Sequence, residues 1–179
     1  MEMKLCRPKI GCSCAPGLKG ILCDKECSEG KYGAGCRQKC GHCIDYTCDP
    51  YSGHCVTGCQ EGYYPPYCQK SYKYLNTAPD VTSVDYDKLL VTFSTEPGVM
   101  SGNGNPAFYQ LQIKDAENGP NTWKELEPIS LPAAQNVSVN ITDLKPGTSY
   151  KVRVVLLDID GNSYQDVNIP VVNVYTKCI

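Results

Sequence analysis

The residues best suited to chemistry lie in the sequence KCGHC at 39–43, and a second His-Cys pair follows at 54–55. Two cysteines separated by two residues can shuttle between dithiol and disulfide when their surroundings lower a thiol pKa. Cysteine sulfurs and histidine nitrogens are also the ligands of zinc sites. Cys40 and Cys43 are therefore candidate redox groups, zinc ligands or structural disulfide partners.

The surroundings of this tetrad argue against redox catalysis. Protein disulfide isomerases carry Cys-Gly-His-Cys at a strand-to-helix junction, where the helix N-terminus lowers the pKa of the first thiol. Here Lys39 precedes the pair and IDYTCDP at 44–50 follows it, with no helical period and no βαβ pattern nearby. We expect no catalytic residue and no cofactor in this chain.

Metal and phosphate binding are also disfavoured. The cysteines around His42 and His54 match a disulfide framework in number, so we expect two exposed loop histidines and no metal. HCVTGCQE at 54–61 begins like the tyrosine phosphatase signature, but Glu61 replaces the Arg that would hold phosphate.

DIDGN at 158–162 begins like a calcium loop. The position of the final bidentate Glu is occupied by Ile169, however. We therefore interpret Asp160-Gly161 as a hairpin turn in a connection between strands.

Cysteine is concentrated in the first third of the chain. Of 13 cysteines, 12 lie between positions 6 and 68, and the other is Cys178. This density indicates a disulfide scaffold and an oxidising, extracellular compartment. The first 70 residues hold few Ile, Val or Leu, so disulfides must stabilise them, by about 2–4 kcal/mol each.

The net charge of −2 gives no electrostatic case for binding nucleic acid or an anionic membrane. The N-terminal sequence has no apolar signal-peptide core, and no run of about 20 apolar residues could cross a bilayer. Because a cysteine framework needs export, we expect the chain to be part of a longer protein.

Three segments align without gaps: CAPGLKGILC at 14–23, CSEGKYGAGC at 27–36 and CQEGYYPPYC at 59–68. Glycine occupies the fourth position of each, as Gly17, Gly30 and Gly62. Glycine supplies a positive φ where a Cβ would clash. Each segment therefore predicts a short hairpin closed by its own disulfide, which gives the pairs Cys14–Cys23, Cys27–Cys36 and Cys59–Cys68.

The sequences GCSC and GYYPPYC resemble the C-terminal half of epidermal growth factor-like (EGF-like) modules. In that family six cysteines pair first with third, second with fourth and fifth with sixth. One complete module fits, and the resemblance implies the pairs Cys40–Cys48, Cys43–Cys55 and Cys59–Cys68. Three residues separate Cys55 from Cys59, where most EGF-like modules have one.

The resemblance extends to the preceding cysteines. Cys27–Cys36 corresponds to the extra loop of laminin-type and scavenger-receptor-type arrays, and Cys14–Cys23 closes an earlier module. Cys6 and Cys12 resemble the third and fourth cysteines of that earlier module, with partners upstream or in each other. RQK before Cys40 lacks the acidic residues of the calcium-binding variant.

Eight tyrosines lie between positions 32 and 74. Amphipathic aromatic side chains suit a recognition surface. In modules without an aliphatic core they also serve as core and as contacts between modules, and we favour this second interpretation.

From Asn76 the composition changes to Val, Ile, Leu, Thr and Tyr with period-2 alternation. Nothing has a convincing helical period. The fold class is therefore an all-β sandwich that follows small disulfide-rich modules. The seven expected strands are VTSV at 81–84, LLVTF at 89–93, YQLQIK at 109–114, TWKEL at 122–126, VSVNITDL at 137–144, YKVRVVL at 150–156 and IPVVNVYT at 169–176.

LKPGTSY at 144–150 predicts a tyrosine corner, in which Leu144 precedes a Pro-Gly turn and the Tyr150 hydroxyl bonds to upstream backbone. With APDV at 78–81 and no internal disulfide, this part resembles a fibronectin type III domain. Phe93 stands where that family usually has Trp, and both are large aromatics suited to burial. We interpret Trp123 as packing from a later strand instead of anchoring a ligand.

Two glycosylation sequons, NVS and NIT, place Asn136 and Asn140 on one outward face of a strand, and we expect at least one to carry a glycan. The expected domains are the C-terminal part of an EGF-like module at 1–25, an EGF-like or laminin-type EGF module at 26–70, a linker at 71–76 and a fibronectin type III domain at 77–177.

This order of modules is that of cell-surface receptor ectodomains. YGAGC at 32–36 and GCSCAPGLKGILC at 11–23 resemble Tie-type receptor tyrosine kinases. The CGHC and SGHCVTGC segments also resemble invertebrate receptor-type tyrosine phosphatases and multiple-EGF-domain phagocytic receptors. The resemblance implies a non-catalytic, extracellular part of a plasma-membrane receptor.

The expected partner is an extracellular protein ligand or a neighbouring receptor, with no nucleic acid and no direct membrane contact in this segment. The loops at 95–107 and 158–163 are the expected contact regions, and Cys178 is left for a partner beyond Ile179. The alternative is a secreted matrix or adhesion protein, or a phagocytic scavenger-type receptor.

Overall fold

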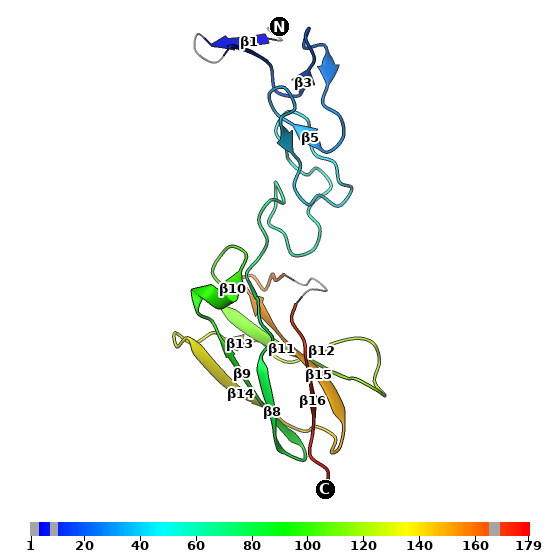
Figure 1. Ribbon diagram of the computed structural model, residues 1–179, viewed down its shortest axis with the longest axis vertical. Coiled ribbons are helices and arrows are strands. Elements are labelled where there is room, and N and C mark those ends of the chain that lie inside the picture. Colours follow the sequence, from blue (N-terminus) through cyan, green and yellow to red (C-terminus); the bar gives the residue numbers. More distant parts are fainter. Residues whose placement is uncertain (1–3, 8–10, 165–168) are drawn as a thin grey trace. The chain divides into compact units, whose positions relative to one another are not determined.

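A computed structural model describes residues 4–7, 11–164 and 169–179 of the chain. The chain divides into two compact units, Met1–Ser71 and Tyr72–Ile179. Strands of both units are labelled in Figure 1 where there is room. The first unit holds the dense cysteines and the second holds the alternating strands.

The first unit is built from short antiparallel strand pairs. These are β1 (Lys4–Arg7) with β2 (Gly11–Cys14), β3 (Leu18–Lys19) with β4 (Lys25–Glu26), and β5 (Lys31–Tyr32) with β6 (Gln38–Lys39). Among its described residues, every buried hydrophobic side chain is a cysteine. Sulfur therefore takes the place that aliphatic side chains hold in larger domains.

The three Cys-x8-Cys loops share one turn. In each loop the amide of the fifth residue donates to the carbonyl of the second, at 3.1 Å for Leu18 and Ala15, 3.2 Å for Lys31 and Ser28, and 3.3 Å for Tyr63 and Gln60. The glycines at the fourth position have φ of 84°, 75° and 88°, as predicted for this turn.

The hairpins reach further than the sequence predicts. Leu18, Lys31 and Tyr63, at the fifth position, pair with residues beyond the second cysteine, namely Glu26, Lys39 and Ser71. The chain turns back at that second cysteine, which has a positive φ of 54–58° in all three loops. Each disulfide loop thus contains the first side of its hairpin, and the second side lies beyond the second cysteine.

The second unit is a sandwich of two antiparallel sheets (Figure 1). One sheet has the order β14 (Asn136–Ile141), β9 (Lys88–Ser94), β8 (Asp80–Asp85). The other has the order β12 (Lys124–Glu125), β11 (Phe108–Asp115), β15 (Ser149–Leu157), β16 (Val172–Tyr175), and β13 (Ile129–Ser130) also pairs with β11. This confirms the all-β fold class.

The core of the sandwich follows the predicted alternation. On β9 every second residue is buried, beginning with Leu89, and the Phe93 ring meets the Tyr109 ring edge-on at 5.2 Å. Phe93 thus fills the position where Trp is usual. The buried core consists of Leu75, Leu89, Val91, Phe93, Tyr109, Leu111, Ile113, Val137, Ile141, Tyr150, Val152, Val154 and Leu156.

Three parts of the second unit differ from the prediction. Tyr74–Leu75, inside the expected linker, forms β7 and pairs with β10 (Met100–Ser101), and Leu75 is 2% exposed in the core. TWKEL contributes only Lys124–Glu125 to β12, and β13 follows separately. A 3-10 turn, Pro97–Val99, lies in the loop before β10. Strands of two residues are too short to show a period, so the sequence did not reveal them.

Candidate functional site

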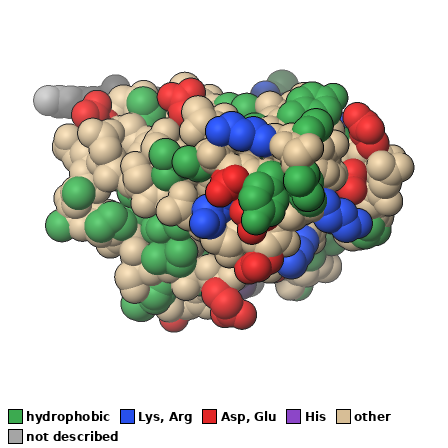
Figure 2. Space-filling model, turned by 90° about the horizontal axis from the view of Figure 1, so that it is seen from below, with side chains coloured by type: hydrophobic (Ala, Val, Ile, Leu, Met, Phe, Trp, Pro, Cys, Tyr) green, Lys and Arg blue, Asp and Glu red, His purple; other side chains and the backbone are tan. Residues whose placement is uncertain are grey.

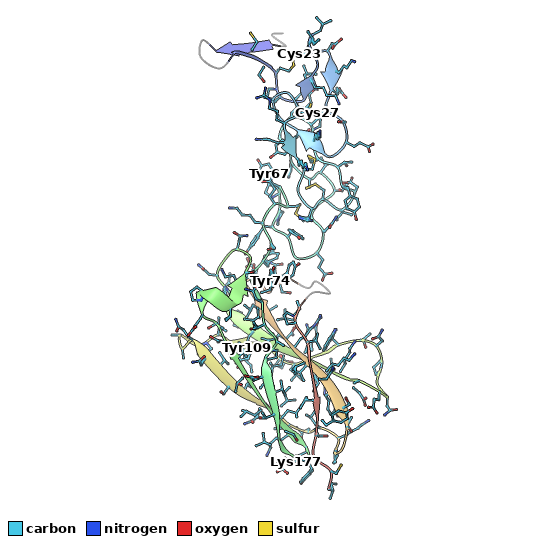
Figure 3. All side chains as sticks on the ribbon, viewed as in Figure 1. Cys23, Cys27, Tyr67, Tyr74, Tyr109 and Lys177 are labelled. Atoms are coloured by element: carbon cyan, nitrogen blue, oxygen red, sulfur yellow. A yellow bond between two sulfur atoms is a disulfide. The ribbon has the colours of Figure 1, made fainter. Side chains whose placement is uncertain are left out.

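Cys40 and Cys43 are held by two different disulfides. Cys40 is bonded to Cys48 and Cys43 to Cys55, with Cα–Cα distances of 5.7 and 5.3 Å. Because neither sulfur carries a thiol, the tetrad has no nucleophile for disulfide exchange in this state. The other expected pairs, Cys14–Cys23, Cys27–Cys36 and Cys59–Cys68, are also joined by disulfides (Figure 3).

The glycine of the tetrad has a packing role. A Cβ built on Gly41 would collide with the backbone carbonyls of Tyr67 and Cys68. The next amide, that of His42, donates to the Cys68 carbonyl at 2.8 Å. Close approach of two backbones therefore explains why glycine stands at position 41 of the tetrad, and no redox chemistry is needed to account for it.

The sulfurs of Cys43, Cys55 and Cys68 are buried and lie within 4.8 Å of one another, a spacing that suits a metal site. They belong to two disulfides, however, and zinc binds thiolates. The cluster is the core of this part of the unit. His42 and His54 are both exposed, and His42 stacks on Tyr63 at 3.9 Å between ring centroids.

Asp49 organises the turn that leads to the second His-Cys pair. Its Oδ1 accepts hydrogen bonds from the Ser52 hydroxyl and the Ser52 amide, both at 2.7 Å, and from the Tyr51 amide at 3.2 Å. The hydrogen bonds from Ser52 are the main cause that holds the pKa of Asp49 below its ordinary value of 3.8. This carboxylate is used to build a turn.

Tyrosine rings pack against glycines of neighbouring loops. The Tyr51 ring lies against Gly17, where an added Cβ would be 2.7 Å away, and the Tyr32 ring leaves no room for a Cβ on Gly53. Backbone hydrogen bonds join the same loops, from Gly17 N to Gly33 O at 3.1 Å and from Gly33 N to Pro50 O at 2.9 Å.

The tyrosines otherwise divide by environment. Tyr74 stacks on Tyr164 in the second unit at 4.4 Å between centroids, which fits a structural role. Tyr46 and Tyr67 are exposed instead, so the structural interpretation holds for only part of the tyrosine set.

The loop DIDGN is closed on itself. Asp158 Oδ1 accepts the amides of Asp160 and Asn162 at 3.0 and 2.8 Å, and Gly161 has a φ of 82°. The Asp158 side chain therefore stabilises the turn of its own loop, and this accounts for the sequence DIDGN without a bound cation.

The tyrosine corner is present in the second unit. The Tyr150 hydroxyl accepts a hydrogen bond from the Lys145 amide at 3.1 Å, and Tyr150 is 8% exposed. Leu144 packs at the edge of the core. The contact fixes the β14–β15 connection to the strand that follows it.

The outer face of the second sheet carries a polar network that the sequence did not reveal. Gln112 and Arg153 lie on this face and are buried there. The Arg153 Nε donates to Gln112 Oε1 at 2.8 Å, and Gln112 Nε2 donates to Glu125 Oε1 at 3.0 Å. Trp123 covers Arg153 at 4.4 Å from the guanidinium to the ring centroid.

Burial lowers the pKa of the Arg153 guanidinium below its ordinary value, and the Glu125 carboxylate opposes this shift. Trp123 packs on the Arg153 side chain of β15, as expected of a packing residue, but it does so from the loop before β12 and not from a strand.

Asn136 and Asn140 are exposed residues of β14. Cys178 is an exposed free cysteine, and Cys12 is disulfide-bonded. The side chain of Cys6, and with it the expected pairing of Cys6, lies outside those that the structure describes.

The model of the fibronectin type III domain family matches residues 77–171, more than half of the chain. The chain belongs to the fibronectin type III family. The matched range begins after β7 and covers the sandwich of the second unit up to the start of β16. Fibronectin type III domains are typically non-catalytic.

Two curated proteins share shorter stretches with this fibronectin type III protein. Dendrite extension defective protein 1 of Caenorhabditis elegans is 51% identical over 47 residues, which is 26% of this chain and 4% of that protein. The angiopoietin-1 receptor of Danio rerio is 42% identical over 48 residues, which is 22% of this chain and 4% of that protein. The matched stretches are thus a small fraction of either relative.

Two solved structures have a similar fold. The fourth FNIII domain of a human protein has a TM-score of 0.46 at 19% identity, covering 62% of this chain and 83% of that one. The FN5 domain of Drosophila Lar has a TM-score of 0.37 at 15% identity, covering 57% of this chain and 97% of that one.

The disulfides and the likeness to a receptor indicate an extracellular domain. Within the described residues, no helix combines the length and apolar character needed to cross a bilayer.

Proposed function

We propose that this chain is a non-catalytic part of a cell-surface receptor ectodomain, in which EGF-like modules and a fibronectin type III domain hold or space an extracellular protein ligand or a neighbouring receptor. The observation that carries this proposal is the succession, in one chain, of a sulfur-cored unit and a sandwich with no disulfide in its described residues. Disulfides of this kind persist in the oxidising extracellular compartment, and the exposed faces of both units are available for recognition.

The receptor class is the finer part of the proposal. The likeness to the zebrafish angiopoietin-1 receptor supports a receptor, in keeping with the resemblance to Tie-type receptor tyrosine kinases. A receptor-type tyrosine phosphatase is the other class that this module order fits. The alternative function is a secreted matrix or adhesion protein, or a phagocytic scavenger-type receptor.

Surface labelling of cells that express the natural coding sequence tests this function. With an epitope tag placed next to the second unit, antibody binding to intact, unpermeabilised cells and resistance to a high-salt wash are expected for a receptor. Tagged protein found in the medium or in the detergent-insoluble matrix, and absent from the cell surface, would favour the secreted alternative.

We also propose that Asn136, Asn140 or both carry N-glycans. Both side chains are exposed on β14, which is an edge strand of its three-stranded sheet, so solvent reaches both side-chain amides. Peptide N-glycosidase treatment of the secreted chain should reduce its mass, and Asn136→Gln with Asn140→Gln should remove the change. An unchanged mass of the wild-type chain would contradict the proposal.

A further inference from the structure

The second unit has a cavity of about 390 Å³ where the β11–β12 and β14–β15 connections come together. Its lining includes the buried Ile113, Ile141 and Tyr150 and the half-buried Leu126 and Leu144. Figure 2 views the molecule from below, and hydrophobic side chains lie beside both signs of charge on that face. The volume lies within the range of sites that hold a small ligand or a large side chain.

A lysine stands at an inward-facing position beside this apolar lining. Lys124 pairs with Ile113 in the register of β12 and β11, so the two side chains share the inner side of the sheet. Its neighbour Glu125 pairs with Gln112 and bonds to it on the outer side. Lys124 lines the cavity and is exposed, and no hydrogen bond or ion pair of its ammonium is found among the described residues.

The acidic residues of the lining are engaged elsewhere. Asp115 Oδ1 accepts the amides of Glu117 and Asn118 at 3.0 and 2.9 Å, and Lys145 lies within its electrostatic reach. Asp143 Oδ2 accepts the Thr142 hydroxyl at 3.0 Å. Of the other two lysines in the lining, Lys145 lies near Asp115, and Lys114 donates to Asn121 Oδ1 at 3.1 Å and lies over the Trp123 ring. Among the described residues, Lys124 is therefore the lysine of the lining whose ammonium is open to a ligand carboxylate.

We infer that this cavity is a docking site for a peptide segment of an extracellular protein partner, one that presents a large apolar side chain next to an Asp or Glu. The apolar side chain enters the cavity and loses its contact with water, which supplies most of the affinity. The adjacent carboxylate pairs with Lys124 and supplies selectivity. This inference rests on the proposed function, since it names the chemistry of the protein ligand.

The test is an NMR titration of the ¹⁵N-labelled full chain with the dipeptide N-acetyl-Phe-Glu-amide. N-acetyl-Phe-Gln-amide is the matched probe, because it differs only in the charge. We expect saturable shifts of the amides of 113–115 and 142–145 with both probes. The Glu peptide should bind roughly two- to fivefold more tightly, as is typical of a solvent-exposed ion pair.

Lys124→Gln should remove the preference for the Glu peptide and leave the spectrum of the free protein in place. Lys151→Gln is the control variant, because Lys151 pairs with Lys114 on the same sheet and is absent from the cavity lining; it should keep the preference. Three results would overturn the inference: no saturable shifts at the cavity, equal affinity for the two peptides, or a preference that survives Lys124→Gln. None of them bears on whether the protein is displayed on cells, so surface labelling judges the proposed function separately.

Discussion

The Tyr150 hydroxyl is one of the groups that hold the β14–β15 connection of the second unit. Tyr150→Phe removes the oxygen that accepts the Lys145 amide at 3.1 Å and leaves that donor without its partner. We expect the free energy of unfolding of the second unit to fall by about 1–3 kcal/mol. Denaturant unfolding followed by the fluorescence of Trp123, the one tryptophan of the chain, measures this change.

Tyr175→Phe is the control for this prediction. Tyr175 is 62% exposed and its hydroxyl donates to Glu117 at 3.5 Å, so its loss should change the stability by less than about 0.5 kcal/mol. Equal effects of the two variants would show that the corner bond contributes nothing of its own.

The Asp49 carboxylate makes its turn sensitive to acid. Because its pKa in the folded chain lies below the ordinary value of 3.8, the stabilisation is present above that value and is lost as the pH falls through the lowered pKa. The chemical shift of the Ser52 amide should therefore titrate with a midpoint below 3.8, and Asp49→Asn should abolish the transition. A midpoint at or above 3.8 would contradict this assignment.

Contacts between loops help to hold the first unit together, beside its disulfides. Gly53→Ala places a methyl group against the Tyr32 ring and requires an alanine at a φ of 82°. We expect at least tenfold faster hydrogen exchange at the Gly33 amide, which donates to Pro50 O at 2.9 Å, because displacing the ring separates the two loops.

Gly58→Ala distinguishes the clash with the Tyr32 ring from the strain of an alanine at positive φ. Gly58 has a similar φ of 98°, but its nearest neighbour, the Ile44 Cδ1, would lie at an ordinary 3.5 Å from the new Cβ. If Gly58→Ala accelerates exchange at Gly33 as much as Gly53→Ala does, backbone strain is responsible and the ring contact is not.

Long strands with many alternating residues were predictable from the sequence, and strands of two residues were not. In β9 the alternation predicts the buried residues one by one. In β11 and β15 it predicts the face on which a residue lies, but most residues of both faces are buried. β7 and β10 have two residues each, and they pair across a distance in sequence that no local pattern encodes. Leu75 was placed in a linker for this reason.

Within the whole molecule, the sequence indicates which cysteines could be bridged and which chemistry is implausible, but not what the polar side chains contact. The burial of Gln112 and Arg153 beneath Trp123 depends on a loop that returns over the sheet. The position of Lys124 beside an apolar cavity depends in the same way on strand register. Alternation predicts the face of the sheet on which a side chain lies, whereas tertiary packing decides whether that side chain is buried.

Peptide mapping of the native, unreduced chain by mass spectrometry tests the central claim that this is a covalently stapled, non-catalytic extracellular piece. Free thiols are first blocked at acidic pH, where exchange is slow. We predict linked peptides for Cys40–Cys48 and Cys43–Cys55, with Cys178 carrying the block. A Cys40–Cys43 disulfide, or blocked thiols at both positions, would contradict the account and restore the redox interpretation of the tetrad.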